Sequence, residues 1–283
     1  MLGAMPLTSG QLDEIATGVR RLVARNPGFM TGPGTNTYLV GTERCAVIDP
    51  GPHDPVHIER VVAATGGRLA AILVTHTHPD HSPAVAALAQ STGAEVLGRP
   101  APVHGRQDAT FVATRVLNDG DVVQIGDLVL RAIHTPGHAS NHLCYLLEGT
   151  GLLFSGDHIM QGSTVVIGPP DGNMQQYLQS LARLQSEPVT RIAPGHGVVI
   201  EDAQGEVTRL IAHRLQREAK VVERLRRAGR ATLDVLVTSV YDDVDPRLHP
   251  VAKGSLLAHL LKLEADGRAA RDTAPDATWW MKE

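Results

Sequence analysis

Short apolar runs alternate with helical patterns along the first two hundred residues. Seven β-rich runs are bounded by Gly, Pro, Asn or Asp, at residues 38–41, 46–49, 70–75, 122–125, 128–133, 142–147 and 152–155. Between them, apolar residues recur with helical spacing at 55–64, 79–92 and 174–184. The alternation predicts an α/β domain built in layers.

The pattern changes near Asp202. Residues 206–227 lose Gly and Pro and place apolar residues on one side of a predicted helix, which Gly229 ends. Helical stretches follow at 233–241 and 249–265, and residues 268–272 and 278–282 flank a turn at 274–277 as a hairpin. Three helices before a terminal hairpin is the order of a winged helix. We therefore predict two domains, at residues 1–205 and 206–283.

Composition restricts the class of protein. The chain has 283 residues, of which 42% are apolar, and a net charge of -4, which is typical of a folded chain. No apolar run approaches the roughly 18 residues that a membrane span needs, so we expect a soluble protein. The first ten residues lack a secretory pattern, which favours the cytoplasm. Cys45 and Cys144 lie in strand-like runs and are expected to be buried, reduced thiols.

Histidines are numerous and clustered: nine of the fourteen lie between residues 53 and 142. Residues 71–81 read AILVTHTHPDH, an apolar strand that runs into four polar side chains. His76 and His78 are two apart on an extended segment, so they point the same way and can share one metal ion. Asp80 and His81, in the first turn of a helix that Pro79 begins, can serve a neighbouring ion. The spacing predicts a metal site.

Three later positions complete the set of metal-ligating side chains. His138 lies in HTPGH, Asp157 in FSGDH and His196 in APGHG. Each follows a predicted strand and has a Gly beside it, and Gly lets the backbone turn tightly around a site. Together with the earlier four side chains they provide ligands for two ions.

The order HxHxDH, then His, Asp and His resembles the metallo-β-lactamase fold hydrolases over nearly all of residues 12–200. The resemblance implies an α/β (α+β) fold, a four-layer αββα sandwich of two mixed sheets with helices outside, here followed by the winged-helix-like domain. It also implies one metal on His76, His78 and His138 and a second on Asp80, His81 and His196, with Asp157 as the bridge.

A closer resemblance is to the lactamase-β-2-like subgroup. It is carried by GTNTYLVG at 34–41, FSGDHIMQGSTVVI at 154–167 and HRLQRE at 213–218, with a winged helix after them. Animal members of the subgroup are linked to cleavage of single-stranded RNA, and fungal relatives to hydrolysis of carrier-bound polyketide thioesters. Penicillin degradation is disfavoured, because zinc β-lactamases with two metals are exported and usually have Cys or no bridging ligand at Asp157.

Hydrolysis is the reaction class that such a centre implies. Two bridged divalent ions lower the pKa of a shared water toward about 7 and polarise a carbonyl or phosphoryl oxygen. We expect zinc, with iron or manganese as alternatives that tolerate the same ligands. Asp80 is the candidate catalytic residue, because it can orient the metal-bridged hydroxide while it holds a metal.

Charge bears on the substrate. The first 205 residues carry 12 basic and 18 acidic side chains, so a surface that steers polyanions is not evident. An apolar lip on the rim loops, formed by Met30, Met160, Pro169 and Pro170, suits an acyl chain. We therefore expect a thioester, a lactone or another ester or amide carbonyl, with single-stranded RNA as the alternative substrate.

A different hypothesis is a winged-helix nucleic-acid-binding protein in which the hydrolase-like domain is only a scaffold. Residues 209–230 hold eight Arg or Lys against two Glu, a pattern that could bind phosphates. Residues 206–283, however, carry 14 basic and 12 acidic side chains. We favour a packing role for this domain, over the active-site mouth or in a homodimer.

Four other histidines need an interpretation. His142 follows His138 by four residues, and it either holds a ligand in place or is a structural histidine. His53, His57 and His104 match no metal position of the family. We predict that these three lie at the surface or at the rim of the site.

Overall fold

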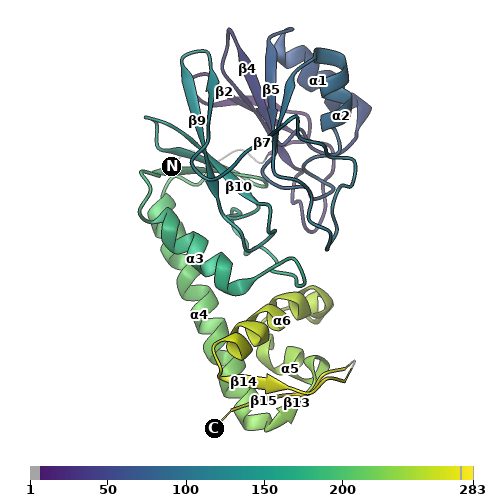
Figure 1. Cartoon of the computed structure of the whole chain (residues 1–283), viewed down its shortest axis with the longest axis vertical. Coiled ribbons are helices and arrows are strands. Elements are labelled where there is room, and N and C mark those ends of the chain that lie inside the picture. The colour runs from purple at the N-terminus through teal and green to yellow at the C-terminus, as the bar shows by residue number, and fades with distance from the viewer. Residues whose placement is uncertain (1–6, 275, 283) are drawn as a thin grey trace. The chain divides into compact units, whose positions relative to one another are not determined.

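The computed structural model describes residues 7–274 and 276–282. Its internal contacts form two compact units (Figure 1). The first contains the chain up to Thr135 together with Asn141–Val165 and Glu187–Gln204. The second contains Pro136–Ser140, Val166–Ser186 and the chain from Gly205 onward. Each unit has its own apolar core and is described separately.

One sheet of the first unit has seven strands, in the order β1 (Leu12–Ala16), β2 (Val19–Val23), β3 (Asn36–Val40), β4 (Cys45–Ile48), β5 (Leu69–Leu73), β6 (Glu95–Gly98) and β7 (Arg115–Val116). Strands β1 to β4 pair antiparallel, and β4 to β7 pair parallel. Parallel neighbours need crossovers, which helices α1 (Pro55–Thr65) and α2 (Val85–Thr92) supply for β4 to β6. Val61 of α1 and Leu88 of α2 pack in one core with Val47 and Ile72.

The other sheet of this unit has five strands, in the order β12 (Arg191–Pro194), β11 (Leu152–Gly156), β10 (Leu143–Leu147), β9 (Leu128–His134) and β8 (Val122–Ile125). Only β11 and β12 run parallel. Both sheets contribute to one buried core, in which the rings of Tyr38 and Phe154 lie 5.1 Å apart. The predicted pair of mixed sheets is therefore confirmed.

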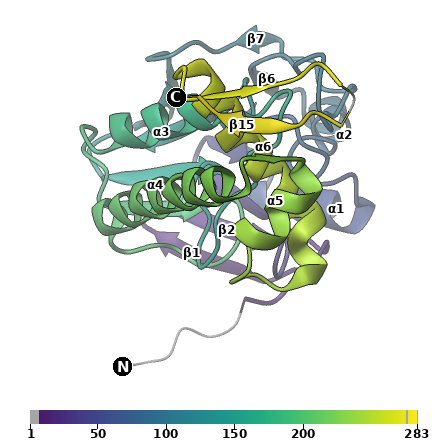
Figure 2. The ribbon, with the colours of Figure 1, turned by 90° about the horizontal axis from the view of Figure 1, so that it is seen from below.

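Helices dominate the second unit: α3 (Met174–Leu184), α4 (Ala203–Ala228), α5 (Leu233–Val240), the short 3-10 helix η1 (Pro246–Leu248) and α6 (His249–Ala265). Strands β13 (Arg230–Ala231), β15 (Trp279–Met281) and β14 (Ala269–Arg271) form a small antiparallel sheet. Figure 2 shows α4, α5, α6 and β15 together. The predicted helices and terminal hairpin are confirmed, except that the hairpin turn includes Pro275, which lies outside the described residues.

The predicted helix over 79–92 is wrong at its start, because α2 begins only at Val85. Pro83 has no N–H, and the N–H of Ala84 bonds to the carbonyl of Gly51, 3.1 Å away, rather than within a helix. Asp80 and His81 therefore lie in turns before the helix and not in its first turn.

The burial of individual side chains shows that one of the predictions made for single residues is wrong. Cys45 and Cys144 are buried, as predicted, and His53 and His104 are exposed. His57 is fully buried, so its predicted surface position is wrong. Its ring faces inward from α1, and Nε2 lies 2.9 Å from Thr37 Oγ1, a hydrogen bond that compensates the buried imidazole. Within residues 7–274 and 276–282, no helix is long and apolar enough to cross a membrane.

Candidate metal centre

The turns that follow β5 carry four of the predicted ligands. After Leu73 the chain leaves the sheet, and the N–H of His81 bonds to the carbonyl of His78, 3.0 Å away. His76 and His81 are buried, whereas Asp80 and His78 are half-buried. Because the chain turns tightly here, side chains of neighbouring residues belong to two different groups of candidate metal ligands.

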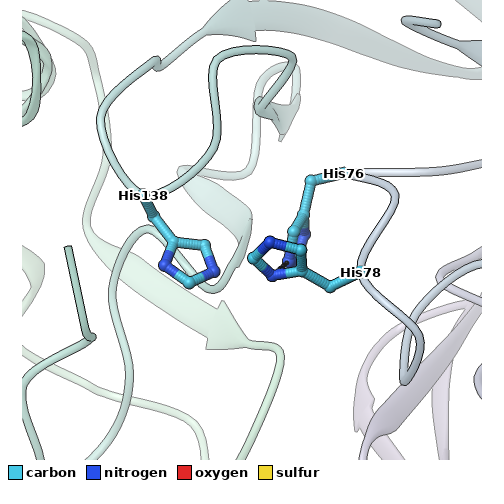
Figure 3. Close-up of side chains that lie close together, drawn as sticks. All are labelled: His76, His78 and His138. Carbon is cyan, nitrogen blue, oxygen red and sulfur yellow. Dashed lines mark hydrogen bonds between the residues drawn. The ribbon is translucent and has the colours of Figure 1, made fainter. Parts of the chain in front are cut away.

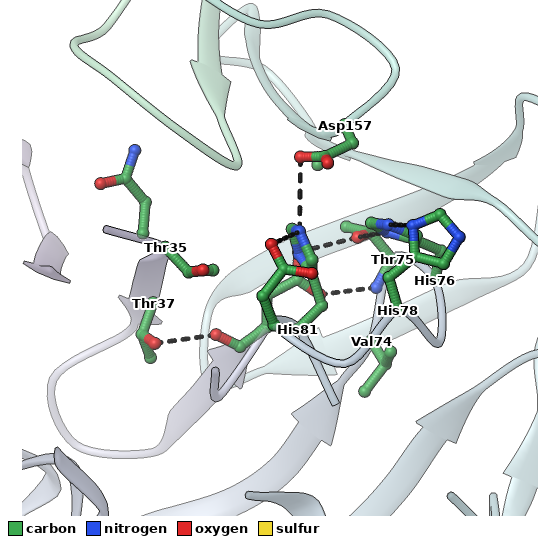
Figure 4. A network of polar contacts seen from close by, with 12 residues as sticks. Thr35, Thr37, Val74, Thr75, His76, His78, His81 and Asp157 are labelled. Atoms are coloured by element: carbon green, nitrogen blue, oxygen red, sulfur yellow. Dashed lines mark hydrogen bonds and ion pairs between the residues drawn. The ribbon is translucent and has the colours of Figure 1, made fainter. Parts of the chain in front are cut away.

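One group contains Asp80, His81, Asp157 and His196, whose ligand atoms lie within 4.8 Å of one another. His81 Nε2 is 3.3 Å from Asp157 Oδ1 and 3.5 Å from Asp80 Oδ2. His196 Nε2 is 3.3 Å from Asp157 Oδ1 and 3.2 Å from Asp80 Oδ2. Figure 4 shows Asp157 pointing toward the ring of His81. Two imidazole nitrogens and two carboxylates thus converge on one point.

A second group contains His76, His78 and His138, again with ligand atoms within 4.8 Å of one another (Figure 3). Nε2 of His76 lies 3.0 Å from Nδ1 of His78. Nδ1 of His138 lies 2.7 Å from the carbonyl oxygen of Val166, which accepts the proton of that nitrogen and places the lone pair on Nε2. All seven predicted ligands therefore fall into two groups, and Asp157, which was predicted as the bridge, lies in the group of Asp80, His81 and His196.

Asp49, which the sequence analysis missed, supports both groups. Its Oδ2 lies 2.9 Å from His81 Nδ1 and accepts the Thr75 hydroxyl at 2.7 Å, while its Oδ1 accepts the N–H of Thr75 at 2.7 Å. The Thr75 hydroxyl is in turn 3.0 Å from His76 Nδ1. One carboxylate thus orients His81 directly and His76 through Thr75. The available signal was an Asp between strand β4 and Pro50.

Two further histidines are held by their Nδ1 atoms. His196 Nδ1 lies 3.2 Å from the carbonyl oxygen of Gly34. His142 Nδ1 lies 2.9 Å from Thr135 Oγ1, and its ring stacks on that of His76 with centroids 5.0 Å apart. A role of His142 in holding His76 in place is consistent with this contact.

Glycines leave the room that this packing needs. Gly156 has φ +45°, and a Cβ there would lie 2.4 Å from Thr75 Oγ1. A Cβ on Gly195 would lie 2.6 Å from Asp157 Oδ1 and 2.9 Å from His81 Cε1. The Gly residues in FSGDH and APGHG therefore allow backbone to approach the ligands closely.

The electrostatics of the acidic group favour positive charge. Burial opposes ionisation of His196, but the carboxylates of Asp157 and Asp80 outweigh it and raise the pKa of His196 to about 9. For His81 the same balance raises the pKa well above its usual value. The pKa of His76, by contrast, is lowered by burial and by the neighbouring imidazoles.

A divalent cation fits the acidic group. Nε2 of His81 and Nε2 of His196 are buried and make no aligned hydrogen bond, although carboxylate oxygens lie 3.2 to 3.5 Å away. A cation between these atoms would accept both nitrogen lone pairs and balance two carboxylates. His and carboxylate ligands suit zinc, iron and manganese.

Comparison with known proteins identifies the family of each part of the chain. A family profile described as "Metallo-beta-lactamase superfamily" matches residues 30–196, and one described as "Beta-lactamase associated winged helix domain" matches residues 232–279. A protein of Aspergillus chevalieri named "Atrochrysone carboxyl ACP thioesterase" is 34% identical over 95% of this chain and 88% of its own length.

One more relative and one solved structure match almost the whole chain. The "Beta-lactamase-like protein 2 homolog" of Drosophila melanogaster is 31% identical over 95% of both chains. A crystal structure of a beta-lactamase domain protein from Burkholderia ambifaria has a TM-score of 0.83 at 22% identity and covers 99% of this chain and 96% of its own. The predicted fold class and the winged helix are confirmed.

Proposed function

We propose that this chain, which belongs to the metallo-beta-lactamase superfamily, hydrolyses a thioester by attack of water on its carbonyl carbon at a centre of two metal ions. That it is a metal-dependent hydrolase follows from the family and from thioesterase-named relatives. The observation that carries the proposal is the sorting of seven His and Asp side chains into two groups of ligand atoms within 4.8 Å.

In this proposal His76, His78 and His138 hold one ion, and Asp80, His81 and His196 hold the other, with Asp157 between the two. The bound ions, proposed to be zinc, supply Lewis acidity, which polarises the carbonyl and acidifies water. Asp49, Gly34 and Val166 accept the Nδ1 protons of His81, His196 and His138 and so direct Nε2 toward the ions.

Asp80 is the proposed catalytic residue. Its side chain is 27% exposed, whereas those of Asp157, His81 and His196 are 11%, 0% and 3% exposed. A carboxylate that is partly exposed could accept a proton from the attacking water if metal ions were bound in this centre. We therefore assign the proton transfer to Asp80 rather than to Asp157.

A thioester is favoured over RNA by two observations. The Aspergillus relative is named a thioesterase. The basic side chains of α4 are also largely neutralised, because Arg217 pairs with Asp243 at 2.7 Å and Arg224 with Asp242 at 3.3 Å. These paired side chains are less available to bind a phosphate backbone. Cleavage of single-stranded RNA is kept as the second candidate, on the basic composition of residues 209–230.

The test compares kcat/KM on an acyl thioester and on an unstructured RNA in one metal-replete preparation. We expect thioester hydrolysis that is lost in His76→Ala. Efficient RNA cleavage that His76→Ala abolishes, with no acyl substrate turned over, would contradict the proposal. Elemental analysis should approach two ions per chain, and Asp157→Ala should lower that value. Asp127→Ala, an exposed carboxylate in a turn, is the matched control.

A further inference from the structure

The second unit contains a cavity of about 460 Å³ between two of its helices. One wall is the loop and first turn of α3, with Pro169, Pro170 and Met174. The opposite wall is the second half of α6, where Leu257 and Leu261 stand one turn apart. Both leucines are only half-buried, so they present apolar surface to the cavity. The volume lies in the range of ligand pockets, roughly 300–1,000 Å³.

The cavity wall is tied to the loop that carries His138. The N–H of Asn173, which lines the cavity, bonds to the carbonyl of Gly137 at 2.7 Å. On the same loop, the N–H of Ser140 bonds to Asp171 Oδ2 at 3.2 Å, and His138 Nδ1 bonds to the carbonyl of Val166. The segments on both sides of His138 therefore belong to one hydrogen-bonded structure with the cavity wall.

The charges around the cavity argue against a phosphate or carboxylate ligand. Its two cationic lining residues are already paired: Lys262 lies 3.0 Å from Glu218 and 2.8 Å from Asp266, and Arg271 lies 3.3 Å from Glu264. An anion would have to compete with these carboxylates. An apolar chain does not compete with these ion pairs, and its binding is favoured because it removes the apolar surface of Leu257 and Leu261 from water.

We infer that this cavity binds the apolar acyl chain of the substrate and makes the hydrolase selective for long acyl groups. The inference rests on the proposed thioesterase function and names the substrate class. The thioester carbonyl would lie near His138, and the hydrocarbon would extend between α3 and α6. Because burial of one methylene is worth about fourfold in affinity, selectivity should rise steeply with chain length.

The experiment measures kcat/KM for acetyl, hexanoyl and decanoyl thioesters of N-acetylcysteamine. We expect the decanoyl ester to be preferred over the acetyl ester by at least about a hundredfold in the unmodified chain. Leu261→Trp fills the cavity and should lower kcat/KM on the decanoyl ester at least about tenfold, with less than about twofold change on the acetyl ester. Leu257→Ala enlarges it and should shift the preference toward longer chains.

Val251→Trp is the matched control, because Val251 lies on the same helix, is 36% exposed and does not line the cavity. It should leave the chain-length preference unchanged. Calorimetry with the thioether S-decyl-N-acetylcysteamine adds a readout that needs no turnover. We expect binding to the unmodified chain and to Val251→Trp, and at least about tenfold weaker binding to Leu261→Trp.

The outcomes separate this inference from the proposed function. Equal kcat/KM on acetyl and decanoyl esters, unchanged in Leu261→Trp, overturns the cavity as an acyl site and leaves the thioesterase function intact. If no thioester is hydrolysed but the thioether binds and Leu261→Trp abolishes binding, the cavity stands and the function fails. If the thioether does not bind and no ester is hydrolysed, both are wrong.

Discussion

Asp49 connects the two ligand groups at the level of single atoms. It is 2% exposed, has φ +51° and accepts hydrogen bonds at both carboxylate oxygens. A non-glycine residue in this backbone region is strained, so surrounding contacts must hold it there. Those contacts are the bonds to Thr75 and His81, which place the strain next to the proposed metal ligands.

We predict that Asp49→Asn weakens metal binding about tenfold to a hundredfold. An amide that keeps its oxygen on the backbone N–H of Thr75 turns its NH₂ toward His81 Nδ1, which then loses its acceptor. The measurement is metal affinity in competition with a chelator. Asp108→Asn is the control, since Asp108 is also buried and accepts a bond from Ser82 at 2.7 Å. Equal affinity in the unmodified chain and in Asp49→Asn would contradict this role.

Helix α6 carries a buried histidine that the proposed chemistry does not use. His259 is fully buried, and neither ring nitrogen makes a hydrogen bond. Burial, together with the charges of Arg214, Lys262 and Arg217, lowers the pKa of His259 to about 3. The imidazole is therefore neutral in the folded second unit.

Acid should destabilise this unit through His259. The unfolded chain takes up the proton near its ordinary pKa of about 6.5, whereas the folded unit does so only near 3, so stability falls as pH drops from 6.5 toward 3. Through this group, a change from pH 7 to pH 5 lowers the free energy of unfolding by about 2 kcal/mol. His259→Leu should remove that loss, whereas His104→Leu at an exposed site should not.

Tryptophan fluorescence in urea measures this effect within the second unit. The chain has two tryptophans, Trp279 and Trp280, and both lie in β15. If the free energy of unfolding of His259→Leu falls with pH as steeply as that of the unmodified chain, His259 is not the group that titrates.

Helix α4 should bind RNA only weakly. Lys220 pairs with Asp242 and Asp243, and Arg217 donates to Val240 and Asp243, so these cations are engaged within the unit. We expect a Kd above about 10 µM at physiological salt and little change in Arg226→Ala/Arg227→Ala, measured by fluorescence anisotropy. Tight binding that weakens steeply with salt, with a slope that the double variant flattens, would favour the nucleic-acid-binding hypothesis.

Metal removal should lower the stability of the folded protein. Ions that bind only the folded state stabilise it by mass action, by about 4 kcal/mol at a thousandfold excess over Kd. A chelator should therefore lower the Tm by roughly 10 °C, and added zinc should restore it. In His196→Ala the shift should be clearly smaller. An unchanged Tm in the unmodified chain would show that folding and metal binding are not coupled.

Local sequence determined most of the elements. Helices α3 and α6 were predicted with their observed bounds, because apolar spacing and flanking Gly, Pro and Asn act over a few residues. Edge elements such as β1, β7 and β13 were not predicted. They are short or exposed, and pairing with a neighbouring strand, which for β7 and β13 is well separated along the chain, rather than their own pattern makes them strands.

The candidate metal site was likewise predicted only in part from the sequence. The spacing HxHxDH and three Gly-flanked residues named all seven members of the two groups without any structure. Only the tertiary structure decided that Asp49 serves both groups, that His57 is buried and that α2 starts at Val85. Each of these depends on a partner far along the chain: Thr75 for Asp49, Thr37 for His57 and Gly51 for the turn before α2. Long-range hydrogen bonds leave no local pattern, so sequence spacing alone does not reveal them.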